Sequence, residues 1–181
     1  MSEGFALFDT AIGTCGVAWN DRGLTGVQLP QSEGGDPRVR MARRHPQALE
    51  ADPPPAVAGA IDGMQALLKG EPRGLLEVEL DDRALSPLSA RVYEISRAIP
   101  PGQTLTYGDI AKQLGDVSLS RAVGQALGAN PWPIVVPCHR ILAAGGRKGG
   151  FSAPGGADTK LRMLEIEGAL APETLPLFGG R

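Results

Sequence analysis

The first thirty residues alternate short apolar runs with polar, glycine-containing turns. Apolar runs lie at residues 5–8, 15–19 and 24–29, and Asn20-Asp21-Arg22-Gly23 separates the last two. Runs of this length, bounded by turn residues, predict β-strands that pair through hairpins. We therefore expect the chain to begin with a three-stranded antiparallel meander.

Helical spacing follows the meander. A helix is predicted over about 37–50, and the prolines at 53–55 end it because proline lacks the N–H that a helix needs. Residues 56–68 carry apolar side chains at helical spacing and stop at Gly70, which predicts a second helix. Residues 75–80 alternate leucine or valine with glutamate, the pattern of a half-exposed strand. Residues 1–82 thus read as a small α/β domain without a chemical motif.

The second half of the chain is mostly helical in pattern. Ser86 can cap a helix that runs through Arg97. Two short helices are predicted at 106–115 and 118–129, the second with its apolar side chains turned inward. Such a pair, joined by a tight turn, has the outline of a helix-turn-helix, although ordinary helical cores contain similar pairs.

The outer face of the second short helix favours a nucleic-acid partner. It carries small or polar residues, among them Ser120, Ala122 and Gln125, and a single arginine, Arg121. Small side chains let a helix approach a phosphate backbone, and an arginine can enter a base stack. Residues 101–150 also hold five basic against two acidic side chains, whereas the whole chain has a net charge of −2.

The tetrapeptide Pro137-Cys138-His139-Arg140 is the main candidate for chemistry. It follows the β-branched run 134–136, which predicts a short buried strand or extended segment. A thiol becomes nucleophilic when a base or positive charge favours its thiolate, so adjacent His139 and Arg140 indicate a reactive cysteine. An isolated pair of this kind is also compatible with a buried cysteine in a turn beside a surface histidine.

The remaining cysteine and histidine carry no predicted function. Cys15 is expected to be a core cysteine and His45 a solvated side chain. No cysteine and histidine cluster has zinc-like spacing, so no metal is expected. The two cysteines are far apart, no apolar run has the length of a membrane span, and the start of the sequence does not resemble a signal peptide. We therefore expect a cytoplasmic protein that does not enter a membrane.

The order of motifs from Ser86 to Gly168 resembles the O6-alkylguanine-DNA alkyltransferases, also called methylated-DNA–protein-cysteine methyltransferases. The resemblance is carried by Thr104-Leu-Thr-Tyr-Gly-Asp-Ile-Ala, Arg121-Ala-Val-Gly, Asn130-Pro and Ile134-Val-Val-Pro-Cys-His-Arg-Ile141. It implies an α/β N-terminal domain of ribonuclease-H-like topology over 1–82. It also implies a mostly α, winged-helix-like domain with the helix-turn-helix over 86–170. Residues 171–181 extend beyond the matching region, and their proline and glycine content predicts a flexible tail.

The resemblance also implies a reaction and its catalytic residues. Cys138 accepts an alkyl group from O6 of alkylguanine, with O4 of alkylthymine left open as a second donor, irreversibly and once per molecule. His139 takes the thiol proton and Glu167 orients His139, the logic of a nucleophile, base and orienting group. Tyr107 donates a proton toward guanine N3. No cofactor is implied, because the alkylated base carries its own leaving group.

The partner implied is double-stranded DNA that contains O6-alkylguanine, bound by a monomer without an obligate protein partner. Arg121 fills the stack when the damaged nucleotide is turned out, and other contacts to DNA come from the same helix pair: Tyr107, Ser120, Ala122 and Gln125. The base pocket is lined by Asn130, Ile141, Phe151 and Ser152. The chain departs from the family at Phe151, where tyrosine is usual, and in a longer loop at 152–156.

Two other functions are compatible with parts of the pattern. A non-catalytic alkyltransferase-like protein grips damaged DNA, but members of that type lack the cysteine that is present here as Cys138. A cysteine hydrolase using Cys138 and His139 lacks an evident oxyanion motif and leaves Tyr107 and Arg121 without a role.

Overall fold

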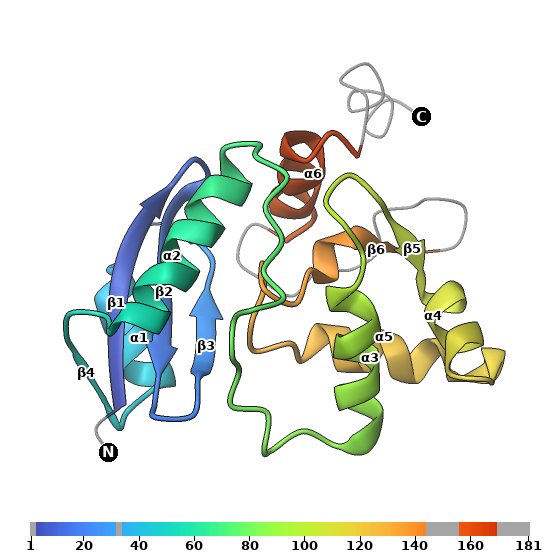
Figure 1. The fold of residues 1–181 in the computed structure, drawn as a ribbon, viewed down its shortest axis with the longest axis horizontal. Helices are drawn as coiled ribbons and strands as arrows, with labels where there is room; N and C mark the ends of the chain where they lie inside the picture. Colours follow the sequence, from blue (N-terminus) through green and yellow to red (C-terminus); the bar gives the residue numbers. More distant parts are fainter. Residues whose placement is uncertain (1–2, 32–33, 144–155, 170–181) are drawn as a thin grey trace.

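The computed structural model describes residues 3–31, 34–143 and 156–169 of the chain. Figure 1 shows a sheet with its helices on one side of the molecule and a helical half on the other. Several sequence predictions fall outside the described residues. These are the tail at 171–181, the pocket residues Phe151 and Ser152, and the longer loop at 152–156 except its last residue.

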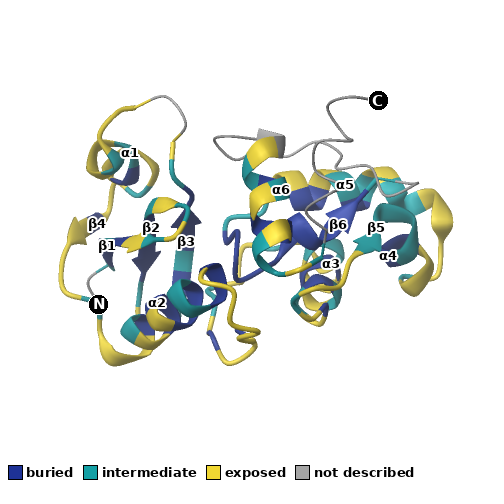
Figure 2. Ribbon diagram, turned by 90° about the horizontal axis from the view of Figure 1, so that it is seen from above, coloured by how far each residue is buried: buried dark blue, intermediate teal, exposed yellow. Residues whose placement is uncertain are grey.

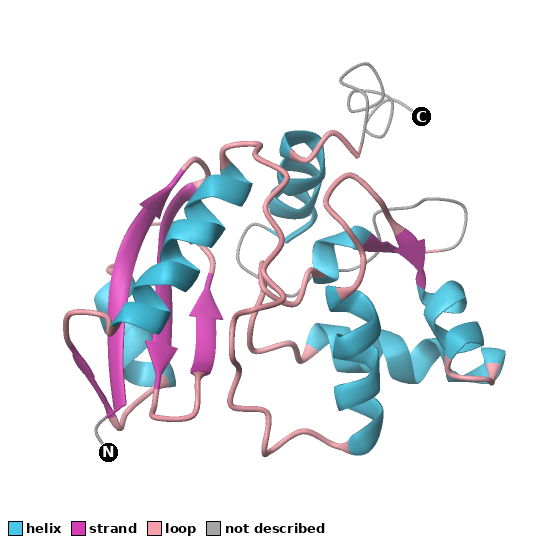
Figure 3. Cartoon of the chain, in the orientation of Figure 1, coloured by secondary structure: helices cyan, strands magenta, loops and turns pink. Residues whose placement is uncertain are grey.

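The N-terminal sheet confirms the predicted meander and adds a fourth strand. Strands β1 (Glu3–Thr10), β2 (Gly13–Trp19) and β3 (Leu24–Gln28) are antiparallel neighbours. Strand β4 (Ala48–Glu50) pairs with β1 in parallel, which gives the order β3-β2-β1-β4. Strand β3 is therefore one edge of this sheet (Figure 3).

The helix predicted over 37–50 is wrong in its second half. Helix α1 (Pro37–Arg44), capped by the side chain of Asp36, ends six residues early, and 48–50 form β4. Pro46 explains this end, because proline disfavours helical backbone at the residue before it, here His45. His45 is half-buried, so the expectation that it is solvated is also wrong in part: its ring packs over Gly26 of β3.

Helix α2 (Pro55–Leu68) confirms the second predicted helix. The two helices cover opposite faces of the sheet, because alternate strand residues belong to separate buried clusters. Phe5 packs with Met41 of α1, whereas Phe8 belongs to the main core with Met64 of α2. Cys15 is fully buried in this main core, as expected.

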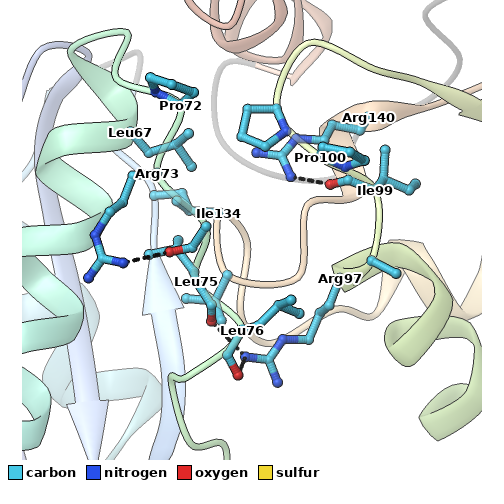
Figure 4. A pocket seen from close by; sticks show the side chains of 14 residues that line it. Leu67, Pro72, Arg73, Leu75, Leu76, Arg97, Ile99, Pro100, Ile134 and Arg140 are labelled. Carbon is cyan, nitrogen blue, oxygen red and sulfur yellow. Dashed lines mark hydrogen bonds between the residues drawn. The ribbon is translucent and has the colours of Figure 1, made fainter.

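Residues 75–80 do not form the predicted strand. Leu75 and Val78 are buried while Leu76 is 67% exposed, a turn-like spacing closed by a hydrogen bond from Val78 N to Leu75 O. Arg97 Nη2 donates to Leu75 O at 2.9 Å (Figure 4). It also donates to Val78 O at 2.8 Å. Arg97 thus binds backbone carbonyls that would otherwise pair with a neighbouring strand. The strand-like pairing that the structure describes for 75–80 is a single isolated bridge between Leu24 and Leu80.

The predicted helices of the second half are confirmed. Helix α3 (Pro87–Arg97) is capped by Ser86, and α4 (Tyr107–Gln113) by a reciprocal pair between Thr106 and Asp109. A turn at Gly115, whose φ is 94°, leads to the short 3₁₀ helix η1 (Val117–Leu119) and to α5 (Ser120–Gly128). Helices α4 and α5 are the helix pair expected from the sequence.

The short strand or extended segment predicted at 134–136 is a tight turn instead. Val136 N donates to Trp132 O at 2.8 Å, and Ile134 takes a positive φ of 79°, a conformation that costs energy for a β-branched residue. The prolines on both sides and the burial of all three side chains favour this compact course. The short 3₁₀ helix η2 (Cys138–Arg140) follows directly.

The chain then forms β6 (Ile141–Leu142), which pairs in parallel with β5 (Leu105–Thr106). The last described helix is α6 (Gly156–Ile166). One continuous buried cluster runs from the N-terminal sheet to Cys138 and Met163. Figure 2 shows this buried interior in dark blue, with exposed positions on the outer turns. Among the described helices, none has the length and apolar character needed to span a membrane.

Candidate active site

The thiol of Cys138 lies at the first residue of η2, in the buried cluster between the two halves. Its residue is 8% exposed, and its backbone N–H donates to Val136 O at 2.7 Å. Burial raises the pKa of Cys138, although a hydrogen bond from Asn130 and the charge of Lys160 act in the opposite direction. The thiol is therefore protonated in the free protein at neutral pH and needs a base before it can act as a nucleophile.

His139, the next residue, is the candidate for such a base. Its residue is fully buried, so the alternative of a surface histidine is wrong. His139 Nε2 lies 2.9 Å from Glu167 Oε2, and because a carboxylate accepts, we assign the ring proton to Nε2. Burial lowers the pKa of His139 despite Glu167, so the ring is neutral at pH 7. Its Nδ1 has no hydrogen-bond partner in the described part of the chain and can accept a proton.

Glu167 is fixed by Arg140 as well as by His139. Arg140 Nε donates to Glu167 Oε1 at 2.9 Å and Nη2 donates to Oε2 at 2.6 Å, a bidentate pair. Arg140 Nη1 donates to Ile99 O at 2.7 Å, an interaction drawn in Figure 4. Burial alone would raise the pKa of Glu167, but the hydrogen bonds from Arg140 and His139 lower it to about 2. The Glu167 carboxylate is therefore charged and held from two sides.

Lys160 is a site residue that we did not predict from the sequence. It is 1% exposed, and its Nζ donates to Ile141 O at 2.6 Å. Burial lowers the pKa of Lys160 to about 8, while the charge of Cys138 acts to raise it. A signal existed, because Lys160 precedes the buried Met163 and Leu164 at helical spacing and so lies on the apolar face of α6.

Tyr107 lies at the same site, whereas Arg121 does not. Tyr107 is the first residue of α4 and is half-buried, and both burial and the charge of Cys138 raise its pKa. Arg121, near the start of α5, is exposed, as is Gln125, while Ser120 and Ala122 are half-buried. The structure therefore separates buried reactive groups from an accessible helix surface.

Asn130 and Ile141 lie on either side of Cys138 in the chain. Asn130 Nδ2 donates to Val136 O at 2.9 Å, and Asn130 Oδ1 accepts from Trp132 N at 2.9 Å. Its side chain thus spans the turn that connects α5 with η2. Ile141 is fully buried and presents its carbonyl to Lys160. The remaining predicted pocket residues, Phe151 and Ser152, lie outside the described residues.

A pocket of about 370 Å³ lies behind this site, between the two halves (Figure 4). Its arginines already donate to backbone carbonyls: Arg73 to Gly74, Arg97 to Leu75 and Arg140 to Ile99. Leucine, isoleucine and proline side chains form much of the remaining wall. Within the described residues, no group of three or more histidine, cysteine or acidic side chains could hold a metal ion.

A neutral histidine beside a buried thiol, next to a helix pair with an exposed arginine, is the arrangement expected of a DNA-binding protein that reacts through cysteine. The family model described as 6-O-methylguanine DNA methyltransferase, DNA binding domain, matches residues 87–169. The methylated-DNA–protein-cysteine methyltransferase of Mycolicibacterium paratuberculosis is 39% identical over 151 residues, 80% of this chain and 89% of that protein. The chain belongs to this methyltransferase family.

Two further similarities concern DNA. The crystal structure of Mycobacterium tuberculosis OGT in complex with DNA has a TM-score of 0.74 and 34% identity, and the match covers 97% of this chain and 99% of that one. A DNA base-flipping protein of Thermus thermophilus is 44% identical over 110 residues, 60% of this chain and 71% of that protein. The fold and the family thus agree on DNA as the partner.

Proposed function

We propose that this protein repairs DNA by moving an alkyl group from O6 of guanine to the sulfur of Cys138, once per molecule. The observation that carries the proposal is the buried contact of neutral His139 with the Glu167 carboxylate directly beside Cys138. Membership of the methyltransferase family, shown by the 39% identical relative, supports the same reaction.

The chemistry balances without a cofactor. The sulfur of Cys138 attacks the alkyl carbon, so a bond from sulfur to carbon forms while the bond from carbon to O6 breaks. The thiol proton passes to His139 Nδ1, directly or through one water, and Glu167 stabilises the resulting imidazolium. Tyr107 donates a proton to guanine N3 and regains one from His139 through solvent. The net transfer is one proton from thiol to guanine, and the thioether product cannot be reduced back.

Lys160 favours the reactive state electrostatically. Desolvation makes a thiolate costly in this buried position, and a nearby ammonium group offsets that cost because opposite charges attract strongly where water is excluded. Lys160 also donates to Ile141 O, so its charge is held in place relative to η2 and β6. We assign it to stabilising the Cys138 thiolate after His139 has accepted the proton.

The helix pair α4 and α5 provides the surface for double-stranded DNA that contains O6-alkylguanine. We propose that Arg121 fills the stack left by the flipped nucleotide and that Ser120, Ala122 and Gln125 contact the DNA around it. The excess of basic side chains in 101–150 would supply phosphate contacts whose strength falls with salt. Asn130 and Ile141, with Phe151 and Ser152, complete the proposed base pocket, and O4-alkylthymine is a second possible substrate.

Finer features of the architecture also belong to this proposal. The order β3-β2-β1-β4, with β4 parallel to β1, supports a ribonuclease-H-like N-terminal domain over 1–82. The β5–β6 pair beside α4 and α5 supports a winged-helix-like domain over 86–170. We further propose that the protein acts as a monomer in the cytoplasm.

The proposal is tested by the intact mass of the protein after incubation with a duplex oligonucleotide that contains O6-methylguanine. The expected result is a gain of one methylene unit, saturating at one per protein, with the added mass on the peptide that contains Cys138. Tight binding without a mass gain would support the non-catalytic alkyltransferase-like alternative. Turnover of an ester or amide at Cys138 would support a hydrolase instead.

An Arg121→Ala variant is expected to react about 10- to 100-fold more slowly with duplex O6-methylguanine, because flipping a base costs a few kcal/mol that Arg121 would offset. Its reaction with free O6-benzylguanine should stay close to that of the wild type, since no base is flipped. Single-turnover rates on both substrates give the comparison. Arg91→Ala removes another exposed arginine, from α3, and serves as the control. Equal losses on both substrates would exclude a flipping role for Arg121.

A further inference from the structure

The helical half contacts the N-terminal sheet along its edge strand β3. An edge strand presents backbone N–H and C=O groups that need partners. Here Val27 N donates to Pro131 O at 2.9 Å, and Leu24 O accepts from Trp132 Nε1 at 2.8 Å. Figure 1 shows β3 as the strand that faces the helical half. Residues 131 and 132, just after α5, are thus bound directly to the sheet.

Trp132 is also linked to the second helix of the DNA-binding pair, through Tyr93 of α3. Its side chain is buried, with the residue 2% exposed, and its ring meets Tyr93 edge to face at a centroid distance of 6.1 Å. The hydroxyl of Tyr93 donates to Ala126 O of α5 at 2.6 Å. The Trp132 indole and the Tyr93 ring together therefore connect the sheet edge with the helix that carries Arg121.

The backbone of Trp132 leads to the nucleophile in two hydrogen-bonded steps. Val136 N donates to Trp132 O at 2.8 Å, and Cys138 N donates to Val136 O at 2.7 Å. The side chain of Asn130 closes the same turn by binding both Trp132 N and Val136 O. A displacement of Trp132 would therefore be transmitted to Cys138 within six residues of chain.

We propose that Trp132 is a positioning residue through which strand β3 of the N-terminal sheet sets the place of Cys138 relative to the DNA-binding helices. This inference rests on the proposed alkyl transfer and gives a role to the N-terminal half, in which the sequence shows no chemical motif. The sheet holds Trp132 in place, and the hydrogen bond from the indole N–H to Leu24 O connects residues 132–138 to the sheet.

The test is a Trp132→Phe variant, which keeps an aromatic ring against Tyr93 and removes the N–H. Leu24 O still accepts from Asp81 N at 2.9 Å, so no buried acceptor is left without a donor and the variant is expected to fold. At saturating DNA, the rate constant for methyl transfer should fall about tenfold, because small misplacements of reacting groups have large effects on rate. The dissociation constant for DNA should stay within about twofold, since the variant leaves the groups on the DNA-binding helices in place.

A second readout does not depend on DNA. Alkylation of Cys138 by iodoacetamide should become several-fold faster in Trp132→Phe, because a less constrained segment exposes the thiol. If the indole only stabilised the fold, the variant would have a lower melting temperature. Its rate of methyl transfer would then not fall while its rate of alkylation by iodoacetamide rises. This readout also separates the two proposals, since it reports on Cys138 even if the wild type transfers no alkyl group.

Trp19→Phe is the matched control. Trp19 is the only other tryptophan of the chain, is buried in β2 and packs over Gly4 inside the N-terminal sheet. This variant should keep wild-type rates in both reactions at a temperature where both proteins are folded. The inference is overturned if Trp132→Phe reacts with DNA and iodoacetamide at wild-type rates, or if Trp19→Phe changes both rates in the same way.

Discussion

A Cys138→Ala variant is expected to lose alkyl transfer completely while still binding alkylated DNA. Alkyl transfer requires a sulfur atom to accept the carbon, and no other described group at the site combines a nucleophile with the neutral base His139. Loss of one small buried side-chain atom should cost no more than about 1–2 kcal/mol of stability. DNA affinity should be close to that of the wild type, because the helix pair α4 and α5 is unchanged.

The measurements are intact mass after incubation with O6-methylguanine duplex and fluorescence anisotropy for binding. Cys15→Ala is the matched control, since Cys15 is also a free, buried cysteine. Burial raises the pKa of Cys15 to about 12, and it lies within the N-terminal sheet, so its loss should leave transfer intact. Methylation of the Cys138→Ala protein at another residue would refute the assignment of the acceptor.

A Glu167→Gln variant is expected to lose both rate and stability. Glutamine can turn its amide toward His139 Nε2 and disturb the tautomer that leaves Nδ1 free to accept a proton, so transfer should slow by about 10²–10³-fold. It also leaves the buried guanidinium of Arg140 without its carboxylate, which should cost about 3 kcal/mol. DNA affinity should change little, because Glu167 is buried away from the exposed residues of α5.

The pH dependence of stability offers an independent check on Glu167. Its pKa is about 2 in the folded protein and near the ordinary value of about 4.3 in the unfolded chain. A carboxylate with a lowered folded pKa stabilises the fold above the unfolded pKa, and this contribution disappears as pH falls toward the folded pKa. The stability difference between wild type and Glu167→Gln should therefore shrink between about pH 5 and pH 2. Denaturant unfolding at several pH values measures it, with the exposed Glu165→Gln on α6 as control. A difference independent of pH would contradict this account.

The parts of the fold that sequence could predict are those with a local cause. Helices α3 and α4 begin directly after their caps, Ser86 and Thr106, and α4 is followed by a turn at Gly115. The turn at 20–23 lies between two short apolar strands. Two of the failures arose where a side chain outside the run decides its structure. The 75–80 run has the alternation of a strand, but Arg97, about twenty residues later, takes its carbonyls. The β-branched run at 134–136 is buried in a turn that Asn130 closes.

The candidate site shows the same division. Cys138, His139 and Tyr107 could be proposed from residue type, order and family resemblance, and the structure brings them together. The bidentate contact of Arg140 with Glu167 depends on how α6 packs against η2, which no local pattern reveals. Lys160 was missed because a lysine near a chain end is usually solvated, whereas here it is buried beside a thiol.

The burial of Cys138 has a further consequence for a protein that reacts only once. An accidental encounter with a small electrophile or oxidant would inactivate such a molecule as surely as repair does. A protonated thiol that is 8% exposed reacts slowly with both, because attack and oxidation proceed through the thiolate. Protonation in the resting state thus lengthens the working lifetime of each molecule and keeps its single reaction available until a damaged base enters the site.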